Sequence, residues 1–133
     1  MAQNFPPDLR AAAHRHMLAA DTLQDGPRKD VAGYLYGLAA ECGFKALMGT
    51  LGMKPLPKER RSMDPFYAHF TELKSMVRDS AEGRQHIDLR KFAEDQNFMA
   101  HWDISMRYSS GKTIKKSWVE CWRRDATAVI AEL

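Results

Sequence analysis

The sequence predicts an all-α fold, in which a single domain over residues 1–133 forms an antiparallel up-and-down bundle of four to five helices. Apolar residues recur every three or four positions through most of the chain, which is the spacing that places them on one face of a helix. Apolar and polar residues nowhere alternate for long enough to build a sheet. The segments between the periodic stretches are short, as they are between neighbouring helices of a bundle.

Two helices are expected in the first half of the chain. The first has Asp8 as its N-cap, directly after two prolines, and ends before the Gly-Pro pair at 26–27. The second runs from near residue 30 to about residue 51. It is apolar on almost every side, as expected of the innermost helix of a bundle.

Small residues follow one another along this second helix. Gly33, Gly37 and Ala40 lie nearly one turn apart, and each glycine costs up to ~1 kcal/mol of helix propensity relative to alanine. Close approach by a neighbouring helix is the simplest compensation for this cost. Gly49 and Gly52 are expected to end the helix.

Three more helices are expected in the second half of the chain. One begins with Asp64 as N-cap and proline at the first helical position, and continues to about residue 79. A turn at 80–85 leads to a helix from about residue 86 to residue 100. The segment 102–108 has weaker periodicity and is expected to be extended or irregular. The last helix starts near residue 113.

The composition is that of an ordinary globular domain, with 44% hydrophobic and 28% charged residues and a formal net charge of +3. Cys42 and Cys121 lie among apolar residues, and two cysteines do not make the disulfide framework of a secreted domain. No apolar run approaches the ~20 residues that span a bilayer, and the N-terminus lacks the features of a signal peptide. These observations predict a cytoplasmic protein without a membrane segment.

Basic residues gather in three short segments, at 54–61, at 112–116 and at 123–124. Such clusters attract phosphate groups. They are equally common on loops and helix faces that simply contact water. The sequence leaves both interpretations open for each segment.

Five histidines raise the question of a metal site: His14, His16, His69, His86 and His101. None of them forms an HExxH motif or pairs with cysteines at zinc spacing. His14 and His16 point about 200° apart on a helix and cannot chelate together. The signatures GxxxxGK[ST], GxGxxG and GxSxG are absent from the sequence as well. We therefore expect neither a metal ion nor a cofactor.

Two charged residues stand out in the apolar second helix. Glu41 and Lys45 lie four residues apart, in the order that favours an ion pair. A carboxylate in such surroundings has to be paired, hydrogen-bonded or protonated. One interpretation is a polar clasp that bonds a neighbouring helix or loop. The other is that both residues belong to a binding site.

Polar and aromatic residues also gather between 97 and 108. They are Asn97, His101, Trp102, Arg107 and Tyr108. A histidine, an arginine and a tyrosine near a helix end can bind a phosphate or a base and move protons. The structural alternative is that the two aromatic residues anchor this segment in the core while the arginine pairs with a buried carboxylate.

Two stretches resemble a known family. The run AGYLYGLAAECGFKALM at 32–48 is similar to the second helix of HEPN domains (higher eukaryotes and prokaryotes nucleotide-binding), and WDISMRYS at 102–109 is similar to the ending common in bacterial members. This resemblance implies an up-and-down helical bundle that is frequently homodimeric. It also implies association with RNA or nucleotides in toxin–antitoxin or phage-defence systems, beside a partner of the nucleotidyltransferase type.

Active HEPN members are metal-independent endoribonucleases, with an arginine followed after four to six intervening residues by a histidine. The nearest match in the expected helix runs from Gln96 through Asn97 to His101, with Gln96 where arginine belongs. A neutral amide cannot supply the charge that stabilises the transition state of phosphoryl chemistry. The resemblance therefore predicts a HEPN-like module with a degenerate catalytic motif, which binds RNA, a nucleotide or a protein partner. The alternatives are an active ribonuclease toxin that uses His101 with Arg107, and a purely structural partner subunit.

The expected site lies where the segment after the fourth helix folds back over the second. This would bring Asn97, His101, Arg107 and Tyr108 to one patch, with Glu41 beneath Arg107 as its counter-charge. Arginine would offer a fork to a phosphate and tyrosine a stacking face. The competing interpretation uses the same residues as an internal clasp. A second copy of the chain is expected to cover the rest of the apolar helix and form a homodimer.

Overall fold

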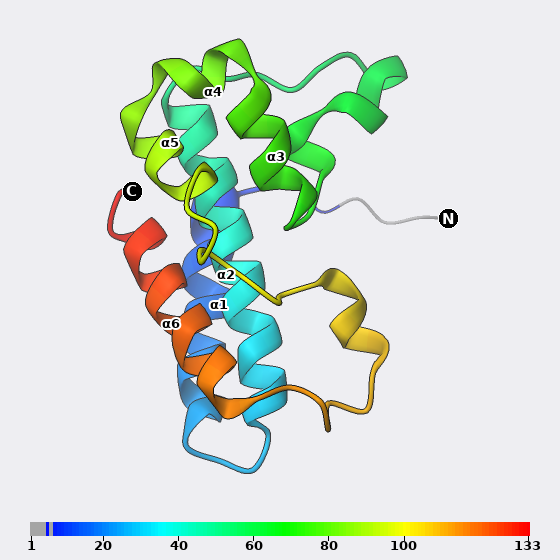
Figure 1. Cartoon of the computed structure of the whole chain (residues 1–133), viewed down its shortest axis with the longest axis vertical. Coiled ribbons are helices and arrows are strands. Elements are labelled where there is room, and N and C mark those ends of the chain that lie inside the picture. Colours follow the sequence, from blue (N-terminus) through cyan, green and yellow to red (C-terminus); the bar gives the residue numbers. More distant parts are fainter. Residues whose placement is uncertain (1–4, 6) are drawn as a thin grey trace.

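The computed structural model describes Phe5 and residues 7–133, and this part of the chain contains helices, turns and loops but no strand (Figure 1). The all-α class predicted from the periodicity is confirmed. The α-helices are α1 (Leu9–Gln24), α2 (Lys29–Thr50), α3 (Glu72–Asp79), α4 (Ala81–Gln85), α5 (Ile87–Ala93) and α6 (Lys116–Ile130). The 3-10 helices are η1 (Lys58–Met63), η2 (Pro65–Tyr67) and η3 (Ile104–Tyr108). Within the described residues, no helix is both long and apolar enough to cross a membrane.

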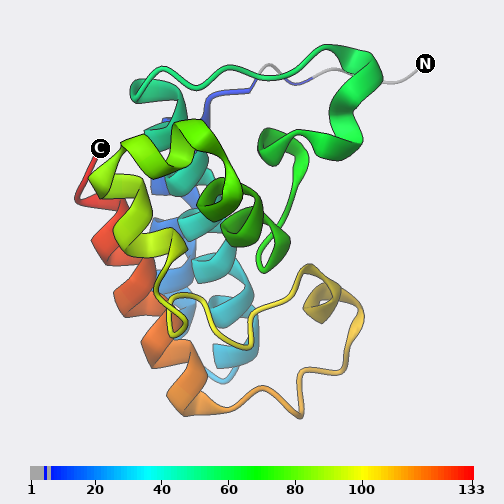
Figure 2. The same cartoon turned by 45° about the horizontal axis from the view of Figure 1, so that its top comes forward.

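The three long helices α1, α2 and α6 form the body of the molecule, with α2 packed against both others. α1 and α2 run in opposite directions, and α6 runs parallel to α2, so that both begin at the lower end in Figure 1. The packing shows the same direction: Gly33 faces Val119 near the start of each helix, and Gly43 faces Val129 further along both. α3, α4 and α5 lie together near the end of α2 (Figure 2).

The first two helices agree with the sequence signals. The Asp8 side chain accepts a hydrogen bond from the backbone N–H of Ala11 at 3.0 Å, which confirms it as the N-cap of α1. α2 is buried along most of its length and includes both Glu41 and Lys45 among its buried residues. It is the innermost helix, as its composition predicts.

The small residues of α2 have two different neighbours. A Cβ atom on Gly33 would lie 2.9 Å from Val119 Cγ2 of α6, so the close approach of a helix is confirmed at that position. A Cβ atom on Gly37 would lie 1.8 Å from Trp102 Nε1, and here the neighbour is an indole ring from a loop. The buried Trp102 therefore fixes the segment before η3 against the middle of α2.

The expected helix from residue 64 to residue 79 is broken into two pieces. Asp64 caps only the short η2, where it accepts from the N–H of Phe66 at 3.0 Å, and its other oxygen accepts from the N–H of Leu56 at 2.9 Å. Ala68 is extended and ends this turn, so that α3 starts at Glu72. The expected turn at 80–85 is the short helix α4, because Ser80 caps it by accepting from the N–H of Gly83.

The expected fourth helix is also too long. α5 ends at Ala93, and turns follow it, with Met99 and His101 at positive φ. The cause is a tertiary contact: Lys74 Nζ donates to the carbonyl oxygens of Asp95 and Phe98 at 2.5 and 2.7 Å. These bonds satisfy carbonyl groups outside a helix, and the turns direct Phe98 and Met99 into the core.

The segment from Trp102 to the last helix is neither extended nor wholly irregular. The side chain of Asp103 accepts from the N–H of Ser105 and caps η3. Gly111 then takes a φ of +81°, which turns the chain against the start of α2. α6 begins at Lys116, slightly later than its apolar pattern predicts.

Candidate functional site

Basic side chains surround the end of the bundle at which α2 and α6 begin, which we call the basic end. Its cations are Arg28, Lys29, Arg107, Lys112, Lys115 and Lys116. Two adjoining hollows of about 340 and 300 Å³ open there, and they share Arg28, Asp30, Gly111 and Ile114 in their linings. The basic cluster expected at 112–116 thus lies beside residues that precede it by about eighty positions in the sequence.

The helix starts add to the positive potential of the basic end. The N-cap residues of α2 and α6 are Arg28 and Lys115, and neither makes a side-chain capping hydrogen bond. Unsatisfied N–H groups at a helix start carry a partial positive charge that favours anions. Arg28 pairs with Asp30 at 2.6 Å, and Lys29 donates to the carbonyl oxygen of Gln24 at 2.9 Å. In the described part of the chain, the other four cations of the basic end form no ion pair.

Arg107 lines the smaller hollow, and the ring of Tyr108 lies beside its guanidinium group. The guanidinium carbon of Arg107 is 5.0 Å from the centre of the Tyr108 ring, and that ring is 80% exposed. The neighbouring Tyr34 side chain raises the pKa of Arg107 above its usual range. Tyr34 is itself stacked on Trp102, with ring centres 5.9 Å apart. The arginine is therefore connected to the core through one aromatic ring and offers a second ring to solvent.

His101 belongs to a second aromatic group near the start of α6. Its ring stacks on Trp118 with a centre-to-centre distance of 4.6 Å and an angle of 14° between the planes. Lys115 Nζ lies 5.2 Å from the centre of the same tryptophan ring. His101 is exposed, so its imidazole remains accessible on the side that the tryptophan does not cover.

Of the residues that the sequence places in one patch, Arg107 and Tyr108 are in contact with each other. Gln96 and Asn97 are exposed in the turns after α5. Among the described residues, no hydrogen bond or ion pair joins Asn97 or His101 to Arg107. The helix that was expected to carry Asn97 and His101 ends at Ala93, and the single patch stays a prediction.

The expected contact between Glu41 and Arg107 is wrong. Glu41 is buried and accepts from Lys45 Nζ at 3.4 Å and from His69 Nδ1 at 3.0 Å. Since His69 lies on the extended segment between η2 and α3, the carboxylate joins this segment to α2. Of the two interpretations of Glu41 and Lys45, the contacts correspond to the polar clasp, and His69 is the loop residue that it bonds.

Among the described residues, the clasp leaves Nε2 of His69 without a hydrogen-bond partner. An ionised carboxylate only accepts hydrogen bonds, so His69 Nδ1 is the donor to Glu41. The side chain is 45% exposed and borders a hollow of about 320 Å³ that is also lined by Tyr67, Thr71, Glu72 and Asp103. The sequence gives one indication that Glu41 has such a partner, because a buried carboxylate needs a hydrogen-bond donor. No spacing rule could identify that donor as His69.

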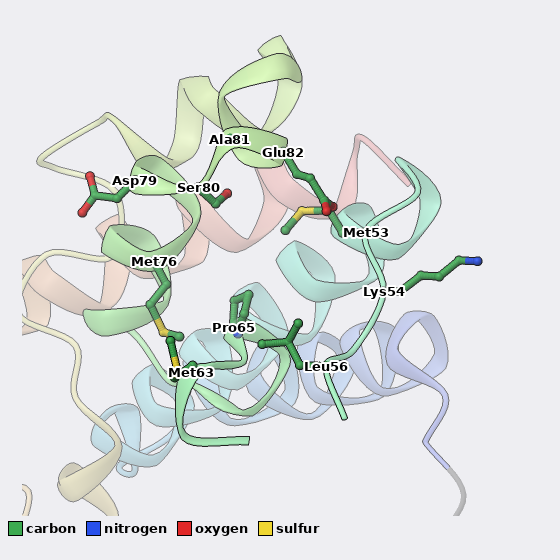
Figure 3. A pocket seen from close by; sticks show the side chains of 10 residues that line it. All are labelled: Met53, Lys54, Leu56, Met63, Pro65, Met76, Asp79, Ser80, Ala81 and Glu82. Carbon is green, nitrogen blue, oxygen red and sulfur yellow. The ribbon is translucent and has the colours of Figure 1, made fainter. Parts of the chain in front are cut away.

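A fourth hollow, of about 540 Å³, lies between the loop after α2 and the helices α3 and α4 (Figure 3). Its apolar side chains are those of Met53, Leu56, Met63, Pro65 and Met76. The ammonium group of Lys54 points away from it in Figure 3. The hollow therefore offers apolar surface and few directed polar groups, in contrast to the basic end.

Within the described residues, no three or more His, Cys, Asp or Glu side chains are placed so that they could hold one metal ion. No protein-family model, curated protein or solved structure matches the chain. The resemblance to HEPN domains therefore stays a prediction from the sequence, and the function has to be argued from the geometry.

Proposed function

We propose that this protein binds single-stranded RNA at the basic end, as a HEPN-like module with a degenerate catalytic motif. The observation that carries the proposal is the pairing of cations with aromatic rings near two hollows, Arg107 on the exposed Tyr108 and Lys115 on the half-buried Trp118. Proteins that bind single strands combine cations that follow the phosphates with rings on which bases stack. Both elements occur here within one end of a small bundle.

The charge distribution supports phosphate binding. The net charge of the chain is only +3, yet the basic end gathers six cations around one carboxylate, Asp30. Arg107, Lys112, Lys115 and Lys116 have no acidic partner in the described part of the chain. Unpaired cations that share a surface raise the local concentration of a polyanion and release its counterions on binding.

The proposal concerns binding and not cleavage. His101 stacks on Trp118, and Gln96 supplies no charge where active family members carry arginine. We expect RNA incubated with the protein to remain intact on a denaturing gel. Specific cleavage that disappears in His101→Ala would instead support the ribonuclease alternative.

Two partners follow from the HEPN resemblance and belong to the same proposal. One is a second copy of the chain, which light scattering at micromolar concentration would detect as a dimer. The other is a nucleotidyltransferase-type protein, which would co-purify when the two are expressed together. If the protein is a monomer and binds RNA normally, the proposed homodimer is ruled out and the proposed RNA site is unaffected.

A pair of matched charge reversals tests the RNA site. In the first variant Lys112, Lys115 and Lys116 become glutamate. In the second the same change is made at 54, 58 and 60, where exposed basic residues follow the opposite end of α2, which is about 33 Å long. Both variants change the net charge equally, so a general charge effect would be the same in both.

Binding of a labelled single-stranded RNA of about 12 nucleotides is measured by fluorescence anisotropy over a range of salt concentrations. We expect the variant at the basic end to lose at least about tenfold in affinity. The slope of log K against log salt should fall by about 2, at ~0.7 for each phosphate contact. The control variant should keep most of the affinity and the slope. Equal losses in the two variants would contradict the proposed site.

A further inference from the structure

The basic end contains one feature that phosphate binding does not explain. Asp30 supplies the only carboxylate among the described residues that line its two hollows, and it lines both. Its side chain is only 18% exposed. Asp30 lies in the first turn of α2, where a carboxylate favours the helix, but its negative charge also weakens the binding of phosphates nearby.

Gly111 and Arg28 lie directly against the carboxylate of Asp30. A Cβ atom on Gly111 would lie 2.1 Å from Asp30 Oδ2, and Gly111 has a φ of +81°. A side chain at this position would therefore displace the carboxylate and also strain the backbone. Arg28 donates to the same oxygen at 2.6 Å and holds the carboxylate in one orientation. An ionised carboxylate has about four lone-pair positions, so further donors can bind beside the arginine.

Aromatic and guanidinium groups lie beside Asp30 in the smaller hollow. Tyr34 follows Asp30 by four residues on α2, which places both on the same side of the helix. Tyr34 is fixed by its stacking on Trp102, and Arg107 lines the same hollow. The hollow of about 300 Å³ thus combines one oriented carboxylate with flat groups on which a base can stack.

The donor pattern of the bases decides which one fits. Guanine has two neighbouring donors on its Watson–Crick edge, N1–H and the N2 amino group, and a carboxylate can accept from both. Adenine and cytosine place a ring nitrogen acceptor next to their amino group, and uracil places carbonyl groups on both sides of N3–H. Each of these would set an acceptor against the carboxylate, which costs affinity.

We infer that the smaller hollow is a guanine subsite of the RNA site, in which Asp30 accepts hydrogen bonds from N1–H and N2–H of an unstacked guanine. This inference rests on the proposed function. Guanine O6 then faces the arginines of the hollow, which is the contact that arginine makes to guanine in other nucleic-acid complexes. Asp30 sets the base preference, while Lys112, Lys115 and Lys116 bind phosphates of any sequence.

The first test changes the RNA and leaves the protein intact. Anisotropy is measured with three labelled RNAs that differ at one central position, which carries guanosine, inosine or adenosine. We expect a preference of about tenfold for guanosine over adenosine, since a good bidentate contact discriminates by that order. Inosine lacks the N2 amino group and should bind several-fold more weakly than guanosine. Equal binding of all three RNAs would overturn the guanine subsite and leave the RNA proposal standing.

The second test changes the protein. Asp30→Asn should abolish the preference for guanosine and bind the adenosine RNA at least as well as wild type, because a negative charge has been removed. The matched control is Asp25→Asn, an exposed carboxylate in the loop before α2, which should keep the preference. A full preference in Asp30→Asn would overturn the role of Asp30. Circular dichroism confirms that each variant is folded, and the inosine comparison decides the question if Asp30→Asn is not.

Competition by free mononucleotides distinguishes a base within RNA from a free nucleotide. We expect GMP to displace the labelled RNA only at far higher concentration than unlabelled RNA does, and more effectively than AMP. If GMP competes as well as the RNA, the ligand is a free guanine nucleotide, and the RNA proposal is overturned. Absence of binding to any of the RNAs or to GMP would overturn both proposals together.

Discussion

The buried ion pair on α2 gives the sharpest prediction about stability. Glu41 and Lys45 have side chains that are 7% and 8% exposed, and the carboxylate also accepts from His69 Nδ1 at 3.0 Å. Glu41→Gln removes the charge and leaves Lys45 without its counter-ion in a desolvated place. Removal of one partner of a buried ion pair costs about 3–5 kcal/mol. The glutamine oxygen still accepts from one donor, so we expect about 3 kcal/mol.

The expected shift in melting temperature follows from the size of the protein. At about 2.1 cal/mol/K per residue, the unfolding entropy of 133 residues is about 280 cal/mol/K. A loss of about 3 kcal/mol then lowers Tm by about 10 °C. Thermal unfolding followed by far-UV circular dichroism measures Tm, and urea unfolding gives the free energy independently.

A matched control is present on the surface. Arg90 and Glu94 form an ion pair with the same spacing at 3.2 Å, but their side chains are 44% and 49% exposed. Glu94→Gln should cost no more than about 0.5 kcal/mol. In the double variant Glu41→Gln/Lys45→Met the buried ammonium is gone as well, and part of the stability should return. A Glu41→Gln variant that costs no more than Glu94→Gln would refute the reasoning, because the pair would then be solvated.

Two further predictions concern packing and pH. Gly37→Ala puts a Cβ atom 1.8 Å from Trp102 Nε1 and should cost at least about 1–3 kcal/mol of stability. A Cβ atom on Gly49 meets nothing within 4 Å, so Gly49→Ala should raise stability by up to ~1 kcal/mol. Urea unfolding that changes the stability of both variants in the same direction would contradict this reasoning. Burial lowers the pKa of His16 in the folded protein below 6.5. At pH values between this lowered pKa and 6.5, the unfolded chain binds more protons than the folded one. The free energy of unfolding therefore falls as the pH drops through this range. His16→Gln should remove this loss in urea unfolding at a series of pH values, and the exposed His14→Gln should keep it.

Local signals were sufficient for the first half of the fold. Asp8 as N-cap and the bounds of α1 and α2 depend on residues within one or two helical turns. The small side chain of Gly33 predicted that a helix approaches there, but not that this helix is α6. The end of α5 depends instead on Lys74, which binds carbonyl groups of residues more than twenty positions later. Helical periodicity continues to about residue 100 in the sequence, and this tertiary contact overrides it.

In the candidate site, too, contacts between sequence neighbours could be predicted and contacts between distant residues could not. Arg107 and Tyr108 are neighbours in the sequence, and their contact follows from that proximity. Glu41 could be identified as a buried carboxylate in need of a partner, but its partner His69 lies 28 residues away. Nothing in the sequence specifies which loop crosses α2 at that point, so the choice of Arg107 as the counter-charge was wrong.

The direction of α6 explains why the basic end exists. Short connections predict antiparallel neighbours, which would place the start of α6 at the end of α2. The chain between 51 and 115 instead returns along the bundle, and the starts of α2 and α6 meet. Lys115 and Lys116 then stand at a helix start, where cations oppose the helix dipole at a cost of about 0.3–1 kcal/mol each. Sequences that violate such a local rule commonly do so at functional sites. The glutamate variant at 112, 115 and 116 should therefore have a higher Tm than wild type while it binds RNA less well. A variant that loses both would indicate that these lysines stabilise the fold, and the argument for the RNA site would lose this support.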